Sequence, residues 1–173
     1  MASQSDVTVK VDLKRINKRD FDQVTLEDAL RVDNLCQDLL MQFYEWMLAN
    51  GVDAVEATSH ARGADYFLRD FVVDIKQRNI FAETAGTIRQ FAGNWYIVNT
   101  LEPDIEVLFR HLEGVRRFYG FLHAHGLISD WFLKEVEREC VDRDYYRQRL
   151  DSFWEISGDG FLVWERKCSL KDD

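Results

Sequence analysis

The sequence predicts a mainly α-helical protein, built as a single five-helix bundle or orthogonal array. Apolar residues recur every three or four positions through the middle of the chain, 46% of the 173 residues are hydrophobic, and there is only one proline. The clearest helix is DIEVLFRHLEGVRRFYGFLHAHG, residues 104–126, which Gly126 ends. Its expected buried face consists of Ile105, Leu108, Leu112, Val115, Tyr119 and Leu122.

Four further helices are expected in a helical core that covers residues 25–142. Thr25 and Asp28 resemble a capping box, which predicts that a helix begins at residue 26 and continues to residue 49. Two glycines in the third helix are expected to permit close helix contact. The second helix is expected to begin near Ser59 and to end near Asn79, and the third covers residues 84–98, which include Gly86 and Gly93. Pro103 is expected in the first turn of the fourth helix, and Ser129 or Asp130 is expected to cap the fifth.

The two ends of the chain are expected to meet in a small antiparallel sheet. In the N-terminal arm, residues 1–24, the segment VTVKVDL at 7–13 alternates apolar and polar residues as a strand does. In residues 143–173, the segments FWEIS and FLVWER flank a Gly-Asp-Gly turn, which is typical of a hairpin. The alternative is that residues 143–156 are helical and the tail is irregular. All 173 residues are expected to form one domain.

The net charge of −9 is concentrated on the first predicted helix. Residues 26–58 contain seven acidic and one basic residue, a net charge of −6. This charge disfavours nucleic acid and anionic lipid as partners. The chain has no apolar run long enough for a membrane span, and its start lacks the pattern of a signal peptide, so a cytoplasmic protein is expected. Cys36, Cys140 and Cys168 are irregularly spaced and are expected to be reduced thiols.

No motif indicates catalysis or cofactor binding. The sequence contains none of the patterns GxGxxG, GxxxxGK[ST], GxSxG and HExxH. His123 and His125 diverge on a helix and cannot share a metal ion, and helix capping explains Ser59 beside His60. We therefore expect no metal, no cofactor and no enzymatic activity. A small-molecule enzyme whose polar cleft assembles from distant helices is kept as an alternative; a deep pocket lined by His60 or His111 with carboxylates would favour it.

The leading hypothesis is a non-catalytic protein-interaction or regulatory domain. Its expected partner face is the polar stripe of the first helix, which includes Glu27, Asp38 and Glu45. The five tryptophans are expected to be core anchors, of which one or two could line a partner groove. A protein partner or self-association is expected, and a membrane is not.

One helix and the turn after it combine apolar and aromatic residues with an arginine and a closing glycine, in the pattern Leu112, Val115, Arg116, Phe118, Tyr119, Phe121, Leu122, Gly126, Leu127 and Ile128. With this pattern, residues 58–128 resemble the helical, SAM-like core-binding domain of tyrosine recombinases and phage integrases. The resemblance implies a stand-alone DNA-associated module, whose candidate phosphate contacts are Arg116, Arg117, Arg143 and Arg147. Recombinase activity is not expected, because no catalytic half with its tyrosine nucleophile follows.

Overall fold

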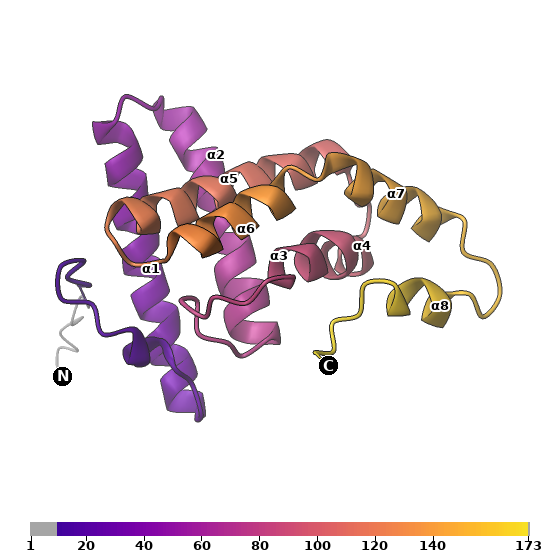
Figure 1. Ribbon diagram of the computed structural model, residues 1–173, viewed down its shortest axis with the longest axis horizontal. Helices are drawn as coiled ribbons and strands as arrows, with labels where there is room; N and C mark the ends of the chain where they lie inside the picture. The colour runs from indigo at the N-terminus through magenta and orange to yellow at the C-terminus, as the bar shows by residue number, and fades with distance from the viewer. Residues whose placement is uncertain (1–9, 173) are drawn as a thin grey trace, which may run out of the picture.

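Helices make up the regular structure of this protein, as the sequence predicts. The computed structural model describes residues 10–172 (Figure 1). Within that range there is no strand, and none of the helices combines the length and the apolar composition that a membrane span requires. In chain order the helices are η1 (Lys18–Phe21), α1 (Leu26–Ala49), α2 (Ala54–Asp65), η2 (Tyr66–Ile75), α3 (Thr87–Gln90), η3 (Phe91–Trp95), α4 (Tyr96–Asn99), α5 (Ile105–Ala124), α6 (Asp130–Cys140), α7 (Arg143–Trp154) and α8 (Phe161–Arg166).

Helix α1 has the bounds that the sequence predicts. The Thr25 hydroxyl accepts a hydrogen bond from the Asp28 amide at 3.2 Å, and the Asp28 carboxylate accepts one from the Thr25 amide at 3.0 Å, which completes the capping box. Val32, Cys36, Leu39, Leu40, Phe43 and Met47 are the buried side chains of this helix.

The arm before α1 is held by helix side chains instead of a sheet. The Val11 amide donates to the Asp38 carboxylate at 2.5 Å, and the Gln42 side chain donates to the Val11 carbonyl at 2.7 Å. The strand predicted for residues 7–13 is therefore wrong for residues 10–13, because α1 satisfies the backbone groups of Val11. Residues 7–9 lie outside the described part of the chain.

Helices α2 and η2 follow one another directly, and the first begins earlier than predicted. The Asp53 side chain caps α2 by accepting from the amides of Val55 and Glu56 at 2.9 and 3.3 Å, so the predicted start near Ser59 is wrong. Helix η2 has π-helical hydrogen bonding, which is frequent at functional sites. It ends at Ile75, four residues before the predicted end.

The centre of the molecule is the close contact between α2 and α5. A Cβ atom at Gly63 would lie 2.7 Å from the Cα of His111, and one at Gly114 would lie 2.3 Å from the His60 carbonyl oxygen. Only glycine lets the two backbones approach so closely. The Asp104 side chain caps α5, so Pro103 lies before the cap and not in the first turn as predicted.

Helices α3, η3 and α4 form the third predicted helix in three consecutive pieces. The buried Glu139 carboxylate of α6 accepts from the amides of Gly86 and Arg89 at 2.6 and 3.0 Å, and so caps α3. Close contact, predicted for both glycines of this segment, occurs at Gly93, where a Cβ atom would lie 3.1 Å from the Tyr145 ring. A Cβ atom at Gly86 would meet nothing within 4 Å, but its φ of +92° favours glycine.

The hairpin predicted for the C-terminal segment is wrong. Helix α7 covers its first part, in line with the alternative prediction, and the glycine-bearing turn leads into α8. Trp164 is 4% exposed, and its ring nitrogen donates to the Arg149 carbonyl at 3.1 Å. This docked tryptophan stabilises a helical turn, which outweighs the β propensity of FLVWER.

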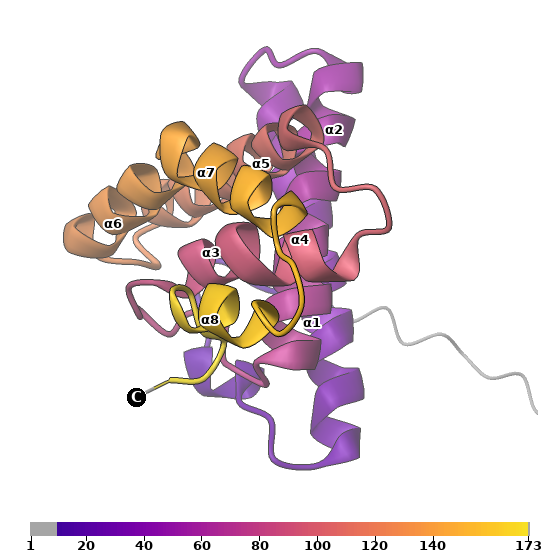
Figure 2. The same cartoon turned by 90° about the vertical axis from the view of Figure 1, so that its right-hand side faces the viewer.

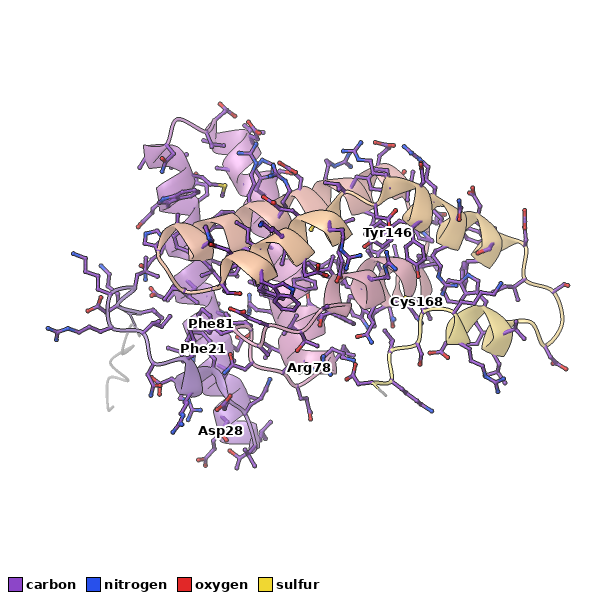
Figure 3. The ribbon with its side chains drawn as sticks, viewed as in Figure 1. Phe21, Asp28, Arg78, Phe81, Tyr146 and Cys168 are labelled. Carbon is purple, nitrogen blue, oxygen red and sulfur yellow. The ribbon has the colours of Figure 1, made fainter. Side chains whose placement is uncertain are left out.

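The helices share one apolar core. Helix α2 packs mainly on α5, while α1 lies against α2 and α6 lies against α5 (Figures 1 and 2). In Figure 1, α5, α6 and α7 run across the direction of α1. Phe21 packs edge-to-face on Phe81 with ring centroids 4.9 Å apart, and so ties the segment before α1 to the loop after η2 (Figure 3). Cys36, Cys140 and Cys168 are buried thiols.

Candidate functional site

A groove between the first half of α1 and helix η2 is the strongest candidate for a functional site. We call it the α1–η2 groove, and its volume is about 560 Å³, within the range of ligand sites. One wall carries Val24, Leu26 and Leu30, whose exposed fractions are 92%, 81% and 64%. The other wall carries Asp70 and Asp74 of η2. The groove thus combines exposed apolar side chains with carboxylates.

Arg69 of η2 pairs with carboxylates of two neighbouring helices, α1 and α2. Its guanidinium donates to both oxygens of Asp33 at 2.7 and 3.1 Å, and to Asp65 at 3.1 Å. The Asp33 hydrogen bonds raise the pKa of Arg69, so this arginine remains charged. Its charge is therefore already shared by two carboxylates of α1 and α2.

Asp70 and Asp74 keep the groove acidic. Burial raises the pKa of Asp70, and the nearby negative charge of Asp65 raises it further. Asp33, Asp70 and Asp74 against Arg69 give the lining of the groove three acidic residues and one basic residue, a net charge of −2. An added positive charge here would relieve the repulsion between carboxylates.

The partner face predicted from the sequence lies beside this groove on α1. Glu27 and Glu45 are exposed, near the two ends of the helix. Asp38, between them, is half-buried and holds the amide of Val11 at 2.5 Å. The arm before α1 therefore crosses the middle of the predicted face.

The four predicted phosphate contacts lie on α5 and α7, in two pairs. Arg116 and Arg117 both donate to Glu113, at 2.7 and 2.9 Å, and the Arg116 hydrogen bond lowers the pKa of Glu113 to about 2. Arg143 and Arg147 stack over one phenylalanine ring of α5, with 4.8 and 5.1 Å between each guanidinium and the ring centroid. Arg147 also lies near carboxylates of α5 and α7. A phosphate at the first pair would compete with an existing carboxylate.

The imidazoles are dispersed over the fold. His60 pairs with Glu56 at 3.1 Å, His123 with Asp130 at 2.6 Å, and burial lowers the pKa of His111. Among residues 10–172, no three His, Cys, Asp or Glu side chains are grouped as a metal site would need. His60 and His111 line two surface hollows of about 510 and 490 Å³ beside the α2–α5 contact.

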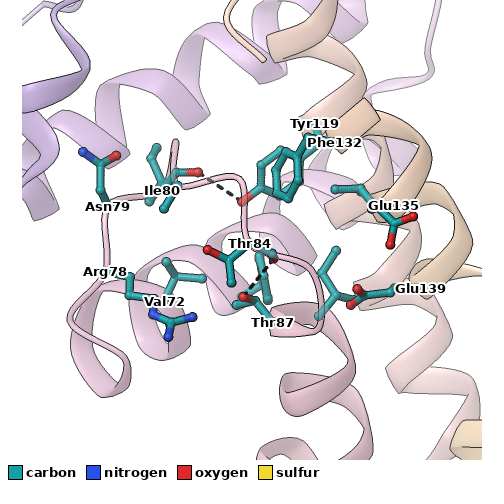
Figure 4. Close-up of a pocket in the computed structure, with 14 residues that line it drawn as sticks. Val72, Arg78, Asn79, Ile80, Thr84, Thr87, Tyr119, Phe132, Glu135 and Glu139 are labelled. Atoms are coloured by element: carbon teal, nitrogen blue, oxygen red, sulfur yellow. Dashed lines mark hydrogen bonds between the residues drawn. The ribbon is translucent and has the colours of Figure 1, made fainter. Parts of the chain in front are cut away.

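A small cavity lies between the loop after η2 and helices α5 and α6 (Figure 4). Tyr119 and Phe132 form one side, and the Tyr119 hydroxyl donates to the Ile80 carbonyl at 3.3 Å. Its volume of about 20 Å³ has room for about one water molecule. Glu135 and Glu139 also line it, and the Glu139 carboxylate is engaged in capping α3. This cavity is too small for an organic substrate.

Sequence reasoning missed Leu26, Leu30 and Met41, which are exposed on α1 although they are apolar. They share one side of the helix with Asp33 and Tyr44, at spacings of three, four and eight residues. The signal was available, since these residues belong neither to the polar stripe around Asp38 nor to the buried side of α1. A helix with two apolar stripes has one more than a single core requires.

Comparison of this chain with protein-family models, with curated proteins and with solved structures finds no match.

Proposed function

We propose that this chain is a non-catalytic protein-interaction module whose α1–η2 groove binds a basic amphipathic helix of a partner protein. The observation that carries the proposal is the exposure of Val24, Leu26 and Leu30, at 92%, 81% and 64%, beside the carboxylates of Asp70 and Asp74. Contiguous exposed apolar residues rimmed by polar ones mark interaction sites. We place the interaction in the cytoplasm, where the buried cysteines would stay reduced.

The chemistry of the groove defines the partner. An amphipathic helix can lay leucine-like side chains against Leu26 and Leu30, while its lysines or arginines approach Asp70 and Asp74. Burial of each large apolar side chain contributes roughly 1.5–3 kcal/mol, and the charges set orientation and the rate of encounter. An acidic helix would meet uncompensated carboxylates and is excluded by charge.

The contacts of Arg116 and Arg117 favour a protein partner over DNA. DNA binding through Arg116 and Arg117 would place a phosphate next to the Glu113 carboxylate, to which each arginine donates below 3 Å. The α1–η2 groove needs no such approach of like charges, because its apolar side chains are already exposed. The protein partner is therefore the better supported of the two classes.

The test is isothermal titration of the full chain with a synthetic helical peptide of leucine and lysine, compared with the same peptide carrying glutamate for lysine. We expect the basic peptide to bind, more weakly as salt rises, and the acidic peptide not to bind. Leu30→Asp should weaken binding at least tenfold, although it adds a negative charge that would strengthen a purely electrostatic association.

The matched control is Leu101→Asp, which adds the same charge at a residue 95% exposed and outside the groove. We expect it to bind as the wild type does. The proposal is wrong if Leu30→Asp binds the basic peptide as tightly as Leu101→Asp, or if neither peptide binds the wild type.

A further inference from the structure

Residues 167–172, which we call the tail, are held mainly by side chains of distant elements. Three side chains, from the end of η2, from α3 and from η3, donate to successive tail carbonyls: Asn94 to Cys168 at 2.5 Å, Gln90 to Ser169 at 3.1 Å, and Lys76 to Leu170 at 2.6 Å. No main-chain hydrogen bond joins residues 169–172 to another element in the part of the chain that the structure describes. The tail can therefore detach without the loss of any helix.

Asp172 completes the attachment of the tail to the end of η2. The Lys76 ammonium donates to its two carboxylate oxygens at 3.2 and 3.1 Å, and the guanidinium of Arg78, labelled in Figure 3, pairs with the same carboxylate. The Lys76 side chain is only 6% exposed. Among residues 10–172, Asp172 is the one carboxylate within 4 Å of either cation. Because a buried ammonium is costly without its carboxylate, Asp172 is needed to keep Lys76 in this position.

Gln77, between these two cations, has a left-handed backbone conformation. Its φ of +49° is the one positive value among the non-glycine residues that the structure describes. The Arg78 amide donates to the Val72 carbonyl at 3.0 Å, which closes the end of η2 around Gln77. A residue with a Cβ atom disfavours this conformation. The contacts of Lys76 and Arg78 with the tail therefore help to hold Gln77 in it.

The same residue borders the α1–η2 groove. Gln77 lines the groove directly after the end of η2. Gln23, another lining residue, donates to the carbonyl of Val73 at 2.9 Å. The segment from Val73 to Arg78 thus borders the groove at Val73 and Gln77, and it contacts the tail through its two cations. A rearrangement of Gln77 on release of the tail would move part of the groove wall.

We propose that the tail regulates the α1–η2 groove: docking of Asp172 on Lys76 and Arg78 holds Gln77 in the conformation that forms the groove. This proposal rests on the proposed function of the groove and adds its regulation. When the tail is released, Gln77 relaxes to a right-handed or extended conformation, and the groove binds the basic helix more weakly. The coupling is reciprocal, so a helix bound in the groove strengthens the docking of the tail.

The first test is the affinity of full-length variants for the leucine and lysine peptide, measured by isothermal titration. Asp172→Asn removes the charge that holds the two cations, and the Asp172 side chain is 45% exposed, so the core is undisturbed. We expect this variant to bind the peptide about fivefold more weakly, or weaker still. The matched control is Asp159→Asn, which removes the same charge from an exposed residue in the turn before α8 and should bind as the wild type does.

The second test uses the thiol of Cys168 as a probe of tail release. Cys168 is 8% exposed while the tail is docked, whereas Cys36 and Cys140 belong to the helical core. Alkylation by iodoacetamide, located by mass spectrometry, therefore measures how often the tail opens. We expect Cys168 to be alkylated about fivefold faster, or faster still, in Asp172→Asn than in Asp159→Asn. Saturation of the wild type with the peptide should slow alkylation of Cys168.

A third variant tests the route through Gln77. Glycine adopts a left-handed conformation without the cost that glutamine has, so Gln77→Gly no longer depends on the tail to keep it. Asp172→Asn should therefore weaken peptide binding less in the Gln77→Gly background than in the wild type. An equal loss in both backgrounds would contradict the proposed route.

These outcomes are distinguishable from failure of the proposed function. If the wild type binds the peptide but Asp172→Asn binds it as tightly as Asp159→Asn does, only the regulation is overturned. The same holds if saturating peptide leaves the alkylation rate of Cys168 unchanged, or if Asp172→Asn does not raise that rate. A wild type that does not bind the peptide overturns the groove itself, and its regulation with it.

Discussion

Replacement of Gly114 by alanine tests how closely α2 and α5 must pack. The new Cβ atom would lie 2.3 Å from the His60 carbonyl oxygen and 3.1 Å from the Ala64 amide nitrogen. Both are backbone atoms, so the clash is relieved only if the helices separate. Overpacking costs about 1–3 kcal/mol, and the gap that opens along the interface adds lost dispersion contacts. Alanine recovers about 1 kcal/mol of helix propensity.

We therefore expect Gly114→Ala to lower the free energy of unfolding by about 2 kcal/mol, which corresponds to a decrease in Tm of roughly 4–8 °C. The assay is urea unfolding followed by far-ultraviolet circular dichroism. Gly120→Ala is the control, because it lies on the same helix and its Cβ atom would meet nothing within 4 Å. It should stabilise the protein by up to about 1 kcal/mol. If Gly114→Ala proves as stable as the wild type, the close contact of the two backbones is not needed.

Three further changes test other parts of the structure. Glu139→Ala leaves two backbone amides at the start of α3 without an acceptor, and should lower the free energy of unfolding by about 2–3 kcal/mol in a urea titration. The stability of Glu139→Gln should lie between those of the wild type and Glu139→Ala. The Glu113 carboxylate, whose pKa the Arg116 hydrogen bond lowers from 4.5 to about 2, stabilises the fold above pH 4.5 and loses this effect as the pH falls toward 2. The stability difference between wild type and Glu113→Gln, measured by urea unfolding, should therefore shrink over that interval; a constant difference would contradict the ion pair. Burial raises the pKa of Asp70, so its ionisation at neutral pH opposes folding. Asp70→Asn should accordingly raise Tm in a thermal scan and lower the affinity for the basic peptide in the titration. A fall in both Tm and affinity would argue against a binding role for Asp70.

The helical class and most helix positions could be predicted, because each depends on local signals. The capping box at Thr25 and Asp28 fixed the start of α1, and Ser129 caps α6 as expected. The start of α2 was missed because Ser59 and Asp53 are both acceptable caps, and only the structure selects Asp53. Two acceptable signals in one segment cannot be ranked by local chemistry alone.

The hairpin prediction for the C-terminal segment failed for a different reason. Two segments rich in aromatic and β-branched residues, FWEIS and FLVWER, on the two sides of a glycine-bearing turn are typical of a hairpin, but Trp164 docks on Arg149 and a helical turn forms. No sequence signal singled out Arg149, and its buried position depends on a hydrogen bond to Gly93, far away in sequence. Tertiary contacts of this kind are invisible to periodicity.

The predicted partner face lies on α1, the helix that also forms one wall of the proposed groove, but on the side next to that groove. Charge spacing singled out Glu27, Asp38 and Glu45, whereas the groove depends on Leu26 and Leu30. Apolar residues on a helix are assigned to the core unless the path of the neighbouring helices is known. The position of η2 beside α1 supplied that knowledge.

The most direct measurement of the central claim is a nuclear magnetic resonance titration of the ¹⁵N-labelled full chain with the leucine and lysine peptide. We expect the amide shifts that change most to belong to Leu26, Leu30 and Asp33 of α1 and to Asp70 and Asp74 of η2. Changes confined to α5 and α7, or no change at a peptide concentration that saturates the calorimetric signal, would contradict binding in the α1–η2 groove.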